Sequence, residues 1–403
     1  MKCTKKLPPA VLALIGLSFA LGSCEYVVVA ILPDIAAGLD ASLGAVGKLV
    51  GVFAAGYAIG TPLVTAATGR TPKYRLLLRL LALFLASNAA SMLAPNLTVL
   101  YLSRAVSAVL TGTLTAVSFL FVREVTPREQ SAGAVSLVYA GMSLATVVGN
   151  PLNKLICRYF GWRAAFAVIL AVGAVLLPVL ARLLPRRLSG TPEEGGGFLR
   201  QFTVLRDPRY TLGVLIAVCS YGATYVVYTY VTPILTDVLG AGESAVSLLL
   251  MLVGLCCMGG NLLAGWVGAR GGVRRTPLVL LGQAALFAAM PALLGGRRTG
   301  VFAVLLMCLM MYIVSTPVQL HALELSERAH PYAASLCAST LSVAANIGVA
   351  LGSFASSALQ GAVGLRALGY PAAVFALAGL AANLALLRAC GSPVNRVSGN
   401  QNA

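Results

Sequence analysis

Residues 7–33 read LPPAVLALIGLSFALGSCEYVVVAILP, an apolar run interrupted by one acid, Glu25. A helix of ~20 apolar residues, rising 1.5 Å per residue, spans a lipid bilayer. A carboxylate inside such a span costs roughly 2.5–3.5 kcal/mol on insertion scales, and intramembrane acids are functional by default. The run therefore predicts a membrane-spanning helix with Glu25 as a candidate functional residue. The alternative is a neutral glutamate that is hydrogen-bonded in a helix interface.

The start of the chain also imitates the signal peptide of a lipoprotein. Three lysines in the first six residues precede the apolar run, and residues 21–24 read LGSC. A lipoprotein continues with a polar tether after its cysteine, whereas this chain continues with apolar residues 26–32. We therefore expect no cleavage at Cys24.

The composition is that of a membrane protein. The chain has 403 residues, of which 59% are hydrophobic and 10% charged. Continuous apolar runs predict helices and exclude a β-barrel. The net charge of +17 comes from basic residues in short loops, so membrane topology explains it better than nucleic-acid binding. The nine cysteines and two histidines form no metal or redox spacing, and we expect no metal and no cofactor.

Hydropathy predicts twelve spans in two six-helix halves. A polar linker, residues 185–210, separates an N-terminal bundle (1–184) from a C-terminal bundle (211–389), and a polar tail (390–403) follows. The predicted spans are 10–33, 45–68, 76–94, 97–122, 133–156, 162–184, 211–236, 244–268, 276–295, 300–325, 332–360 and 368–389. Lysine and arginine gather in the loops on the side of both termini, which predicts that both termini are cytoplasmic.

The two halves repeat at a constant offset of 200 residues. Pro33 corresponds to Pro233 and Gly60 to Gly260, and the correspondence continues through later spans. Two six-helix halves that start on the same side form a parallel repeat about an axis along the membrane normal. We therefore predict an all-α membrane protein with the major facilitator fold, twelve transmembrane helices in two halves related by pseudo-two-fold symmetry.

Arg104, inside the fourth span, is the predicted partner of Glu25. Helical rise places Glu25 ~12 Å and Arg104 ~10 Å from the outer ends of their spans. Opposite charges at matched depth should pair, because neither is tolerated alone. Burial favours a protonated carboxyl and a nearby cation favours a charged one, so a change in the pair would move a proton. The alternative is a static pair that fixes helix packing.

Polar side chains recur at helical spacing on the spans expected to line a central cavity. They predict a pocket with polar tips and aromatic walls for a neutral or amphipathic solute, although packing or an interfacial belt accounts for them equally well. The candidate substrate-binding residues are Ser18, Thr111, Thr115, Ser118, Tyr221, Tyr225, Tyr228, Tyr312, Ser315 and Gln319.

Two further motifs predict close helix packing and anchoring. Glycines allow close helix approach, and cations anchor a turn to cytoplasmic water and anionic lipid. Proline frees a carbonyl and bends its helix. The first motif, G-x8-G-x3-K-x-R, contains Gly60, Gly69, Arg70, Lys73 and Arg75. The second lies in the fifth span and contains Gly141, Gly149 and Pro151.

These stretches resemble the bacterial drug:proton antiporter family of twelve-helix facilitators. The chain is most similar to the cluster of arabinose, purine ribonucleoside and chloramphenicol efflux proteins. The resembling stretches are CEYVVVAILPDIAAGL, TPLVTAATGR, AGMSLATVVGNPL followed by FGWRAAF, YVVYTYVTPILTDV, and ESAVSLLL with GNLLAGWVGARGG. The resemblance implies alternating access and proton-driven export. It makes Glu25 the acid of helix 1, and Arg104 with Gly112 the motif of helix 4.

The chain departs from the family pattern at four positions. Thr65 stands where the acid of the helix 2–3 motif is usual, and Ala269 stands where Asp often precedes Arg270. Asn150 and Asn153 replace small or apolar residues.

Taken together, these features predict a monomeric secondary transporter of the cytoplasmic membrane that exports a small solute in exchange for protons. A proton-independent facilitator of a sugar or nucleoside is the alternative. A receptor or a membrane enzyme is a third class, but no nucleophile with a base, metal spacing or phosphate loop supports an enzyme.

Overall fold

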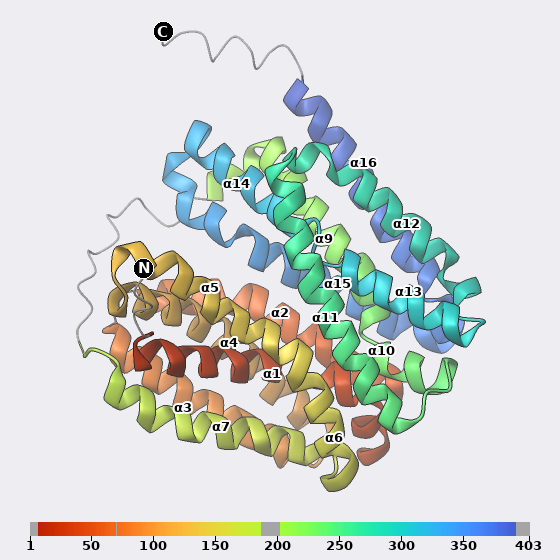
Figure 1. Ribbon diagram of the computed structural model, residues 1–403, viewed down its shortest axis with the longest axis horizontal. Coiled ribbons are helices and arrows are strands. Elements are labelled where there is room, and N and C mark those ends of the chain that lie inside the picture. Colours follow the sequence, from red (N-terminus) through yellow and green to blue (C-terminus); the bar gives the residue numbers. More distant parts are fainter. Residues whose placement is uncertain (1–6, 70, 187–201, 392–403) are drawn as a thin grey trace, which may run out of the picture. The chain divides into compact units, whose positions relative to one another are not determined.

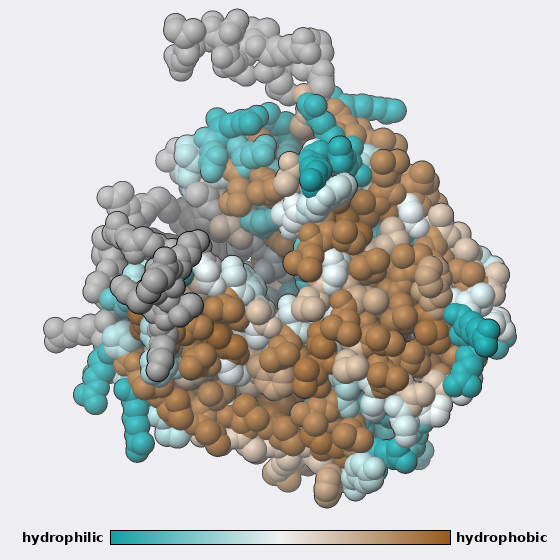
Figure 2. All heavy atoms as spheres, in the orientation of Figure 1, coloured by the Kyte–Doolittle hydropathy of each residue, from teal (hydrophilic) through white to brown (hydrophobic). Residues whose placement is uncertain are grey.

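The computed structural model of the chain describes residues 7–69, 71–186 and 202–391. These residues fold into helices, and twelve spans are long and apolar enough to cross a membrane, as the sequence predicts (Figure 1). The surface in Figure 2 is largely hydrophobic, and hydrophilic residues gather near the helix ends. Exposed side chains such as Leu262 (74%) and Phe160 (78%) suit contact with lipid. A multi-pass membrane protein is therefore the fold class.

The described residues form two compact units. The first contains residues 7–69 and 71–186 with Val231–Thr236 and Ala241–Leu255, and the second contains residues 202–230, 237–240 and 256–391. The predicted linker lies mostly outside the described residues, as does the tail beyond Gly391.

Seven α-helices and one π-helix build most of the first unit. They are α1 (Pro9–Gly38), α2 (Leu43–Ala67), α3 (Lys73–Met92), α4 (Leu97–Val125), α5 (Arg128–Leu144), η1 (Ala145–Gly149), α6 (Asn150–Phe160) and α7 (Trp162–Leu183). α1 is the central element, because it packs against α2, α4, α5, α6 and α7. The side chains of Ser42 and Asn96 accept hydrogen bonds from the first turns of α2 and α4, which explains where these helices begin.

The second unit is organised around α9 (Pro208–Tyr228), which packs against α14, α15 and α16. Its other helices are η2 (Phe202–Arg206), η4 (Gly272–Arg274), α12 (Thr276–Leu293), α13 (Arg297–Met310), α14 (Ser315–Ala329), η5 (Pro331–Ala333), α15 (Ala334–Ala367) and α16 (Gly369–Gly391). Buried Ile216, Leu280, Val318 and Leu386 form one apolar cluster among these helices. The helix α11 (Glu243–Ala269) begins in the first unit and ends in the second.

Three spans that the sequence predicts as continuous helices are interrupted. The interruptions are the π-helix η1, the short segments α10 (Val231–Pro233) and η3 (Ile234–Val238) after α9, and a turn at residues 311–314 before α14. A proline lies beside each break, namely Pro151, Pro233 and Pro317. Proline has no N–H to donate to the carbonyl four residues earlier, so the α-helical ladder fails at that point.

Candidate functional site

Arg104 of α4 is fully buried inside the first unit. Its Nη1 donates a hydrogen bond to Sγ of Cys24 at 3.1 Å. Its guanidinium carbon lies 4.3 Å from the ring centroid of Phe53 and 6.0 Å from that of Phe166. Aromatic faces attract a cation by ring electrostatics, which offsets part of the cost of burying this charge.

The predicted ion pair between Glu25 and Arg104 is wrong. None of the ion pairs among the described residues joins the two, although Arg104 acts electrostatically on the half-buried Glu25. Consecutive helical residues point about 100° apart. The α1 side chain that accepts the hydrogen bond of Arg104 is Cys24, and Glu25 lies one such rotation further round the helix.

Glu25 instead lies near aromatic hydroxyls that the sequence analysis did not select. Its charge acts on Tyr57 of α2, which also interacts with Tyr139 of α5. Tyr57 is half-buried and Tyr139 is 52% exposed. The acid of α1 therefore hydrogen-bonds the side chain of Tyr26 and lies within electrostatic range of the Tyr57 phenol and the buried Arg104 guanidinium. Tyr26 is the next residue in the sequence, whereas no spacing signals that Tyr57 approaches the acid.

The predicted polar stripe of α4 is buried in the structure. Thr111, Thr115 and Ser118 are all less than 10% exposed. The hydroxyl of Thr115 donates to the carbonyl of Thr111 at 2.9 Å, whereas the hydroxyls of Thr111 and Ser118 have no hydrogen-bond partner among the described residues. Ser18 is buried where α1 meets α5. Buried hydroxyls without partners are uncommon and suit a site that hydrogen-bonds a solute.

The predicted tyrosines lie together in the second unit. Tyr221, Tyr225 and Tyr228 of α9 are all less than 10% exposed. The ring of Tyr221 meets that of Tyr312 edge-on at 5.9 Å, and Tyr225 meets Tyr228 at 5.2 Å. Tyr312 comes from the turn before α14, so aromatic rings from two segments meet here, and their role as the wall of a solute pocket stays a prediction.

Gln319 and Ser315 occupy different surroundings on α14. The side-chain amide of Gln319 donates to the carbonyls of Cys337 and Ala338 at 3.1 and 3.3 Å, and its oxygen accepts from the N–H of Leu341 at 3.3 Å. These bonds attach α14 to α15. Ser315 is the first residue of α14 and is buried.

The conformational motifs lie at close helix contacts. A Cβ on Gly60 would collide with the side chain of Val109 of α4, and one on Gly141 would lie 2.7 Å from the carbonyl oxygen of Ile15 on α1. Gly149 and Pro151 flank the junction of η1 and α6, where Ser23 would lie 2.9 Å from a Cβ on Gly149.

The basic part of the first motif lies in the turn between α2 and α3. The ammonium of Lys73 donates to the carbonyls of Gly69 and Thr68 at 2.9 and 3.2 Å, which caps the end of α2. Arg75 is exposed, and Arg70 lies outside the described residues.

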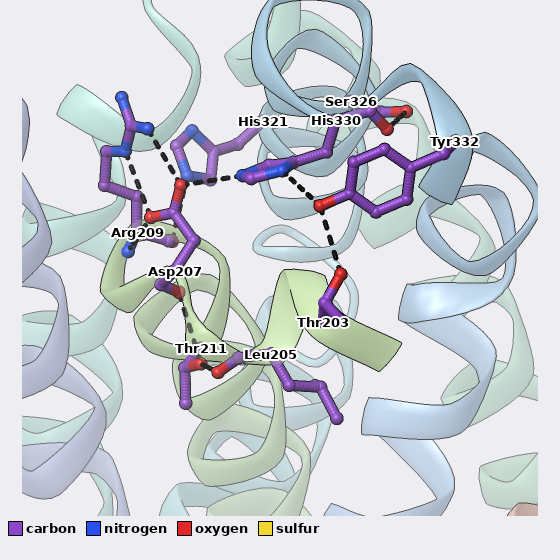
Figure 3. Close-up of polar contacts among 9 residues, drawn as sticks. All are labelled: Thr203, Leu205, Asp207, Arg209, Thr211, His321, Ser326, His330 and Tyr332. Atoms are coloured by element: carbon purple, nitrogen blue, oxygen red, sulfur yellow. Dashed lines mark hydrogen bonds and ion pairs between the residues drawn. The ribbon is translucent and has the colours of Figure 1, made fainter. Parts of the chain in front are cut away.

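A polar cluster at the start of α9 was not predicted (Figure 3). Arg209 binds both carboxylate oxygens of Asp207, at 3.1 and 2.8 Å. His330 Nε2 lies 3.0 Å from Asp207 Oδ2, and its Nδ1 lies 2.9 Å from the hydroxyl of Tyr332. The Tyr332 hydroxyl accepts a hydrogen bond from Thr203 at 3.2 Å. The cluster connects η2 to the junction of α14 and η5.

Two ion pairs lie in the first unit. Lys154 of α6 contacts both carboxylate oxygens of Asp34 of α1, at 3.0 and 2.7 Å, and is largely buried. Arg158 Nε lies 3.0 Å from Glu243 Oε2, and both side chains are exposed. No group of three metal-ligating side chains lies together in the part of the chain that the structure describes.

Twelve apolar spans among the described residues, with charged and polar side chains buried inside the bundles, define a polytopic membrane protein. The chain belongs to the Major Facilitator Superfamily, because the model of that family matches residues 14–336. Its fold class and its assignment as a transporter rather than an enzyme follow, and they confirm the predictions from sequence. Members of this superfamily carry small solutes by secondary transport.

Individual relatives of the chain are transporters of the same superfamily or resistance proteins. The chain is 30% identical over 359 residues to the uncharacterized MFS-type transporter YtbD of Bacillus subtilis (strain 168), covering 89% of this chain and 90% of that protein. It is 30% identical over 275 residues to the chloramphenicol resistance protein of Streptomyces lividans, covering 66% and 69%. The expected likeness to a cluster of proteins that includes chloramphenicol resistance proteins is thereby confirmed.

A solved structure shares the fold at low sequence identity. It is the bacterial homolog to the human lysosomal transporter Spinster, in an inward-facing and unoccupied conformation. The TM-score is 0.77 at 16% identity, with 96% of this chain and 100% of that chain covered.

Proposed function

We propose that the chain exports a small neutral or amphipathic solute in exchange for protons by alternating access. The observation that carries the proposal is Glu25, a half-buried acid within the apolar helix α1 that Arg104 influences without an ion pair. A carboxyl in this position takes up a proton when its surroundings become apolar and releases it when a cation approaches. Proton binding is thereby linked to any motion that changes the distance between Glu25 and Arg104.

The proton gradient is an adequate energy source for export. One elementary charge moving through 100 mV supplies about 2.3 kcal/mol. Since 1.4 kcal/mol corresponds to a tenfold concentration ratio, one proton can support a substantial solute gradient.

Each unit supplies its own set of candidate solute contacts. In the first unit the unpartnered hydroxyls of Thr111 and Ser118 supply hydrogen bonds, and in the second Tyr221, Tyr225 and Tyr312 supply aromatic surface. Aromatic walls with few polar tips suit sugars, nucleosides and uncharged drugs. The chloramphenicol resistance protein among the relatives makes chloramphenicol the first solute to test.

We further propose that the protein is a monomer in the cytoplasmic (inner) membrane with both termini in the cytoplasm. The distribution of lysine and arginine supports this orientation. Exposed Arg75 and the capping Lys73 then lie on the cytoplasmic side, next to anionic lipid headgroups.

Glu25→Gln in proteoliposomes tests the proposal. Solute-driven proton release should disappear, while the amount of folded protein and solute binding remain. Asp34→Asn, which removes an acid elsewhere on α1, is the matched control. Its proton release, measured per amount of folded protein, should equal that of the wild type. Coupling that persists in Glu25→Gln excludes this residue from proton exchange. If the wild type transports the solute at the same rate after the proton gradient is collapsed, the protein is a proton-independent facilitator instead.

A further inference from the structure

Among the described residues, no carboxylate forms an ion pair with Arg104. Within residues 7–69, 71–186 and 202–391, Arg104 makes one hydrogen bond, to the sulfur of Cys24, which is a weak acceptor, and both residues are fully buried. The Nε and Nη2 atoms of Arg104 have no hydrogen-bond partner among the described residues. Apart from the aromatic rings of Phe53 and Phe166, the guanidinium is therefore held by one weak hydrogen bond, and it retains two donor groups for a further acceptor.

The thiol that contacts Arg104 is itself oriented. The S–H of Cys24 donates to Oδ1 of Asn88 at 3.4 Å, and Nδ2 of Asn88 donates to the carbonyl of Phe84 at 2.8 Å. Because the amide nitrogen is engaged by α3, the amide oxygen faces the thiol. The S–H then points to Asn88, and the sulfur lone pairs face the guanidinium.

Two serine pairs fix the register between α3, which carries Asn88, and α4, which carries Arg104. Ser87 bonds to Ser107 and Ser91 to Ser103, each at 2.8 Å, between α3 and α4. The pairs flank Asn88 on one helix and Arg104 on the other. Sliding of α4 along α3 would break both pairs, so they fix the position of Arg104 relative to Asn88, which in turn binds the Cys24 thiol.

Glu25 is the next residue of α1 after Cys24, and it is the carboxylate that Arg104 already influences. We propose that Cys24 is a positioning residue that holds Arg104 away from Glu25, with Asn88 orienting the thiol. This inference rests on the proposed proton exchange. With Arg104 held by sulfur, Glu25 is free to take up a proton; without the thiol, the guanidinium turns to the carboxylate.

Substitution of the thiol tests this role through the pH profile of transport. An opposite charge within a few ångströms favours the charged carboxylate by about one to three pH units. In Cys24→Ala the midpoint of proton-coupled transport should therefore move to lower pH by about that amount, whereas Cys24→Ser, which keeps an acceptor, should restore the wild-type midpoint. Cys219→Ala, which also truncates a buried cysteine, should leave it unchanged. A Cys24→Ala midpoint equal to wild type would overturn the proposal.

A second measurement reads the contact without transport. The infrared S–H stretch of Cys24, isolated as the difference between wild type and Cys24→Ala, reports the hydrogen bonds of this thiol. Arg104→Lys and Asn88→Ala each alter one of its two partners, and both should shift the band. An unmoved band in both variants refutes the positioning role even if proton exchange holds. Loss of the Glu25 dependence of coupling refutes proton exchange even if the band shifts.

Discussion

The hydroxyl of Thr232 donates a hydrogen bond to the carbonyl of Val29 at 2.8 Å, and the two residues lie in the same unit. Val29 is four residues before Pro33, so its carbonyl lacks the N–H that an uninterrupted helix would provide. Thr232 also approaches the carbonyl of Ala30 at 3.2 Å, just before the non-helical backbone of Ile31. A residue from the second sequence half thus satisfies the carbonyl that the proline frees.

Thr232→Val tests the value of this contact. A buried carbonyl left without a partner costs about 1–3 kcal/mol, so the variant should unfold at lower temperature or denaturant concentration. Pro33→Ala restores the helical N–H and removes the need for Thr232. In a double-mutant cycle the cost of Thr232→Val should therefore be much smaller in the Pro33→Ala background. Equal costs in the two backgrounds would show that the hydroxyl does not serve this carbonyl.

The ion pair of Lys154 and Asp34 makes a second prediction. Breaking a buried pair leaves an uncompensated charge and costs about 3–5 kcal/mol, and partial exposure of Asp34 places this site at the lower end. Asp34→Asn should accordingly lower the free energy of unfolding by about 3 kcal/mol. The apolar double variant Asp34→Leu with Lys154→Met should recover most of the loss, because both charges are then absent.

The exposed pair of Arg158 and Glu243 is the control for that experiment. Solvent-exposed pairs contribute about 0–1 kcal/mol, so Glu243→Gln should unfold almost as the wild type does. A loss in Glu243→Gln as large as in Asp34→Asn would contradict the view that burial sets the cost.

Gly141 and Gly133 lie on the same helix and make opposite predictions. A Cβ on Gly141 would lie 2.7 Å from the backbone carbonyl of Ile15, which cannot move without α1, whereas nothing lies within 4 Å of a Cβ on Gly133. Gly141→Ala should cost about 1–3 kcal/mol through overpacking. Gly133→Ala should be neutral or stabilise by up to about 1 kcal/mol through helix propensity. Chemical unfolding of both variants measures the difference; similar losses would contradict a close α1–α5 contact.

The positions of the spans were predictable from sequence because hydropathy depends only on residue type. The breaks were less visible from sequence, since α1 is only kinked at Ile31, near Pro33, while Pro233 and Pro317 lie beside interruptions. Whether a proline bends or breaks its helix depends on what satisfies the freed carbonyl. That partner, such as Thr232 for Val29, comes from another part of the chain.

The sequence predicts how deep each candidate residue lies along its helix, but not which side of the helix faces the site. Helical rise places Glu25 and Arg104 at similar levels, yet a rotation of one residue exchanges Glu25 for Cys24. Helix packing sets that rotation, and no local pattern encodes it. Asn88 could have been found, because it is a polar residue inside an apolar span, as Glu25 is. Gln319 is a polar residue that the sequence selects as a solute contact, but its side-chain amide is hydrogen-bonded to the backbone of α15.

The cluster around Asp207 predicts a pH-dependent stability. Burial acts to raise the pKa of Asp207, but hydrogen bonds donated by Arg209 and His330 outweigh it and hold the pKa well below its usual range. A carboxyl whose pKa is lowered by folding stabilises the protein above its unfolded pKa of about 3.9, and this contribution is lost as the pH falls toward the lowered folded value.

Asp207→Asn should therefore be less stable than wild type at neutral pH, by about 2 kcal/mol for the charged hydrogen bonds that it loses. The difference in stability between the two proteins should narrow below about pH 4, because protonation of wild-type Asp207 then removes the stabilisation that its charge provides. Thermal unfolding of the two purified proteins between pH 7 and about pH 3 measures it. Glu324→Gln, in an exposed pair with Arg328, should match wild type at every pH. A gap between Asp207→Asn and wild type that stays constant on acidification would mean that the carboxylate charge does not hold this cluster together.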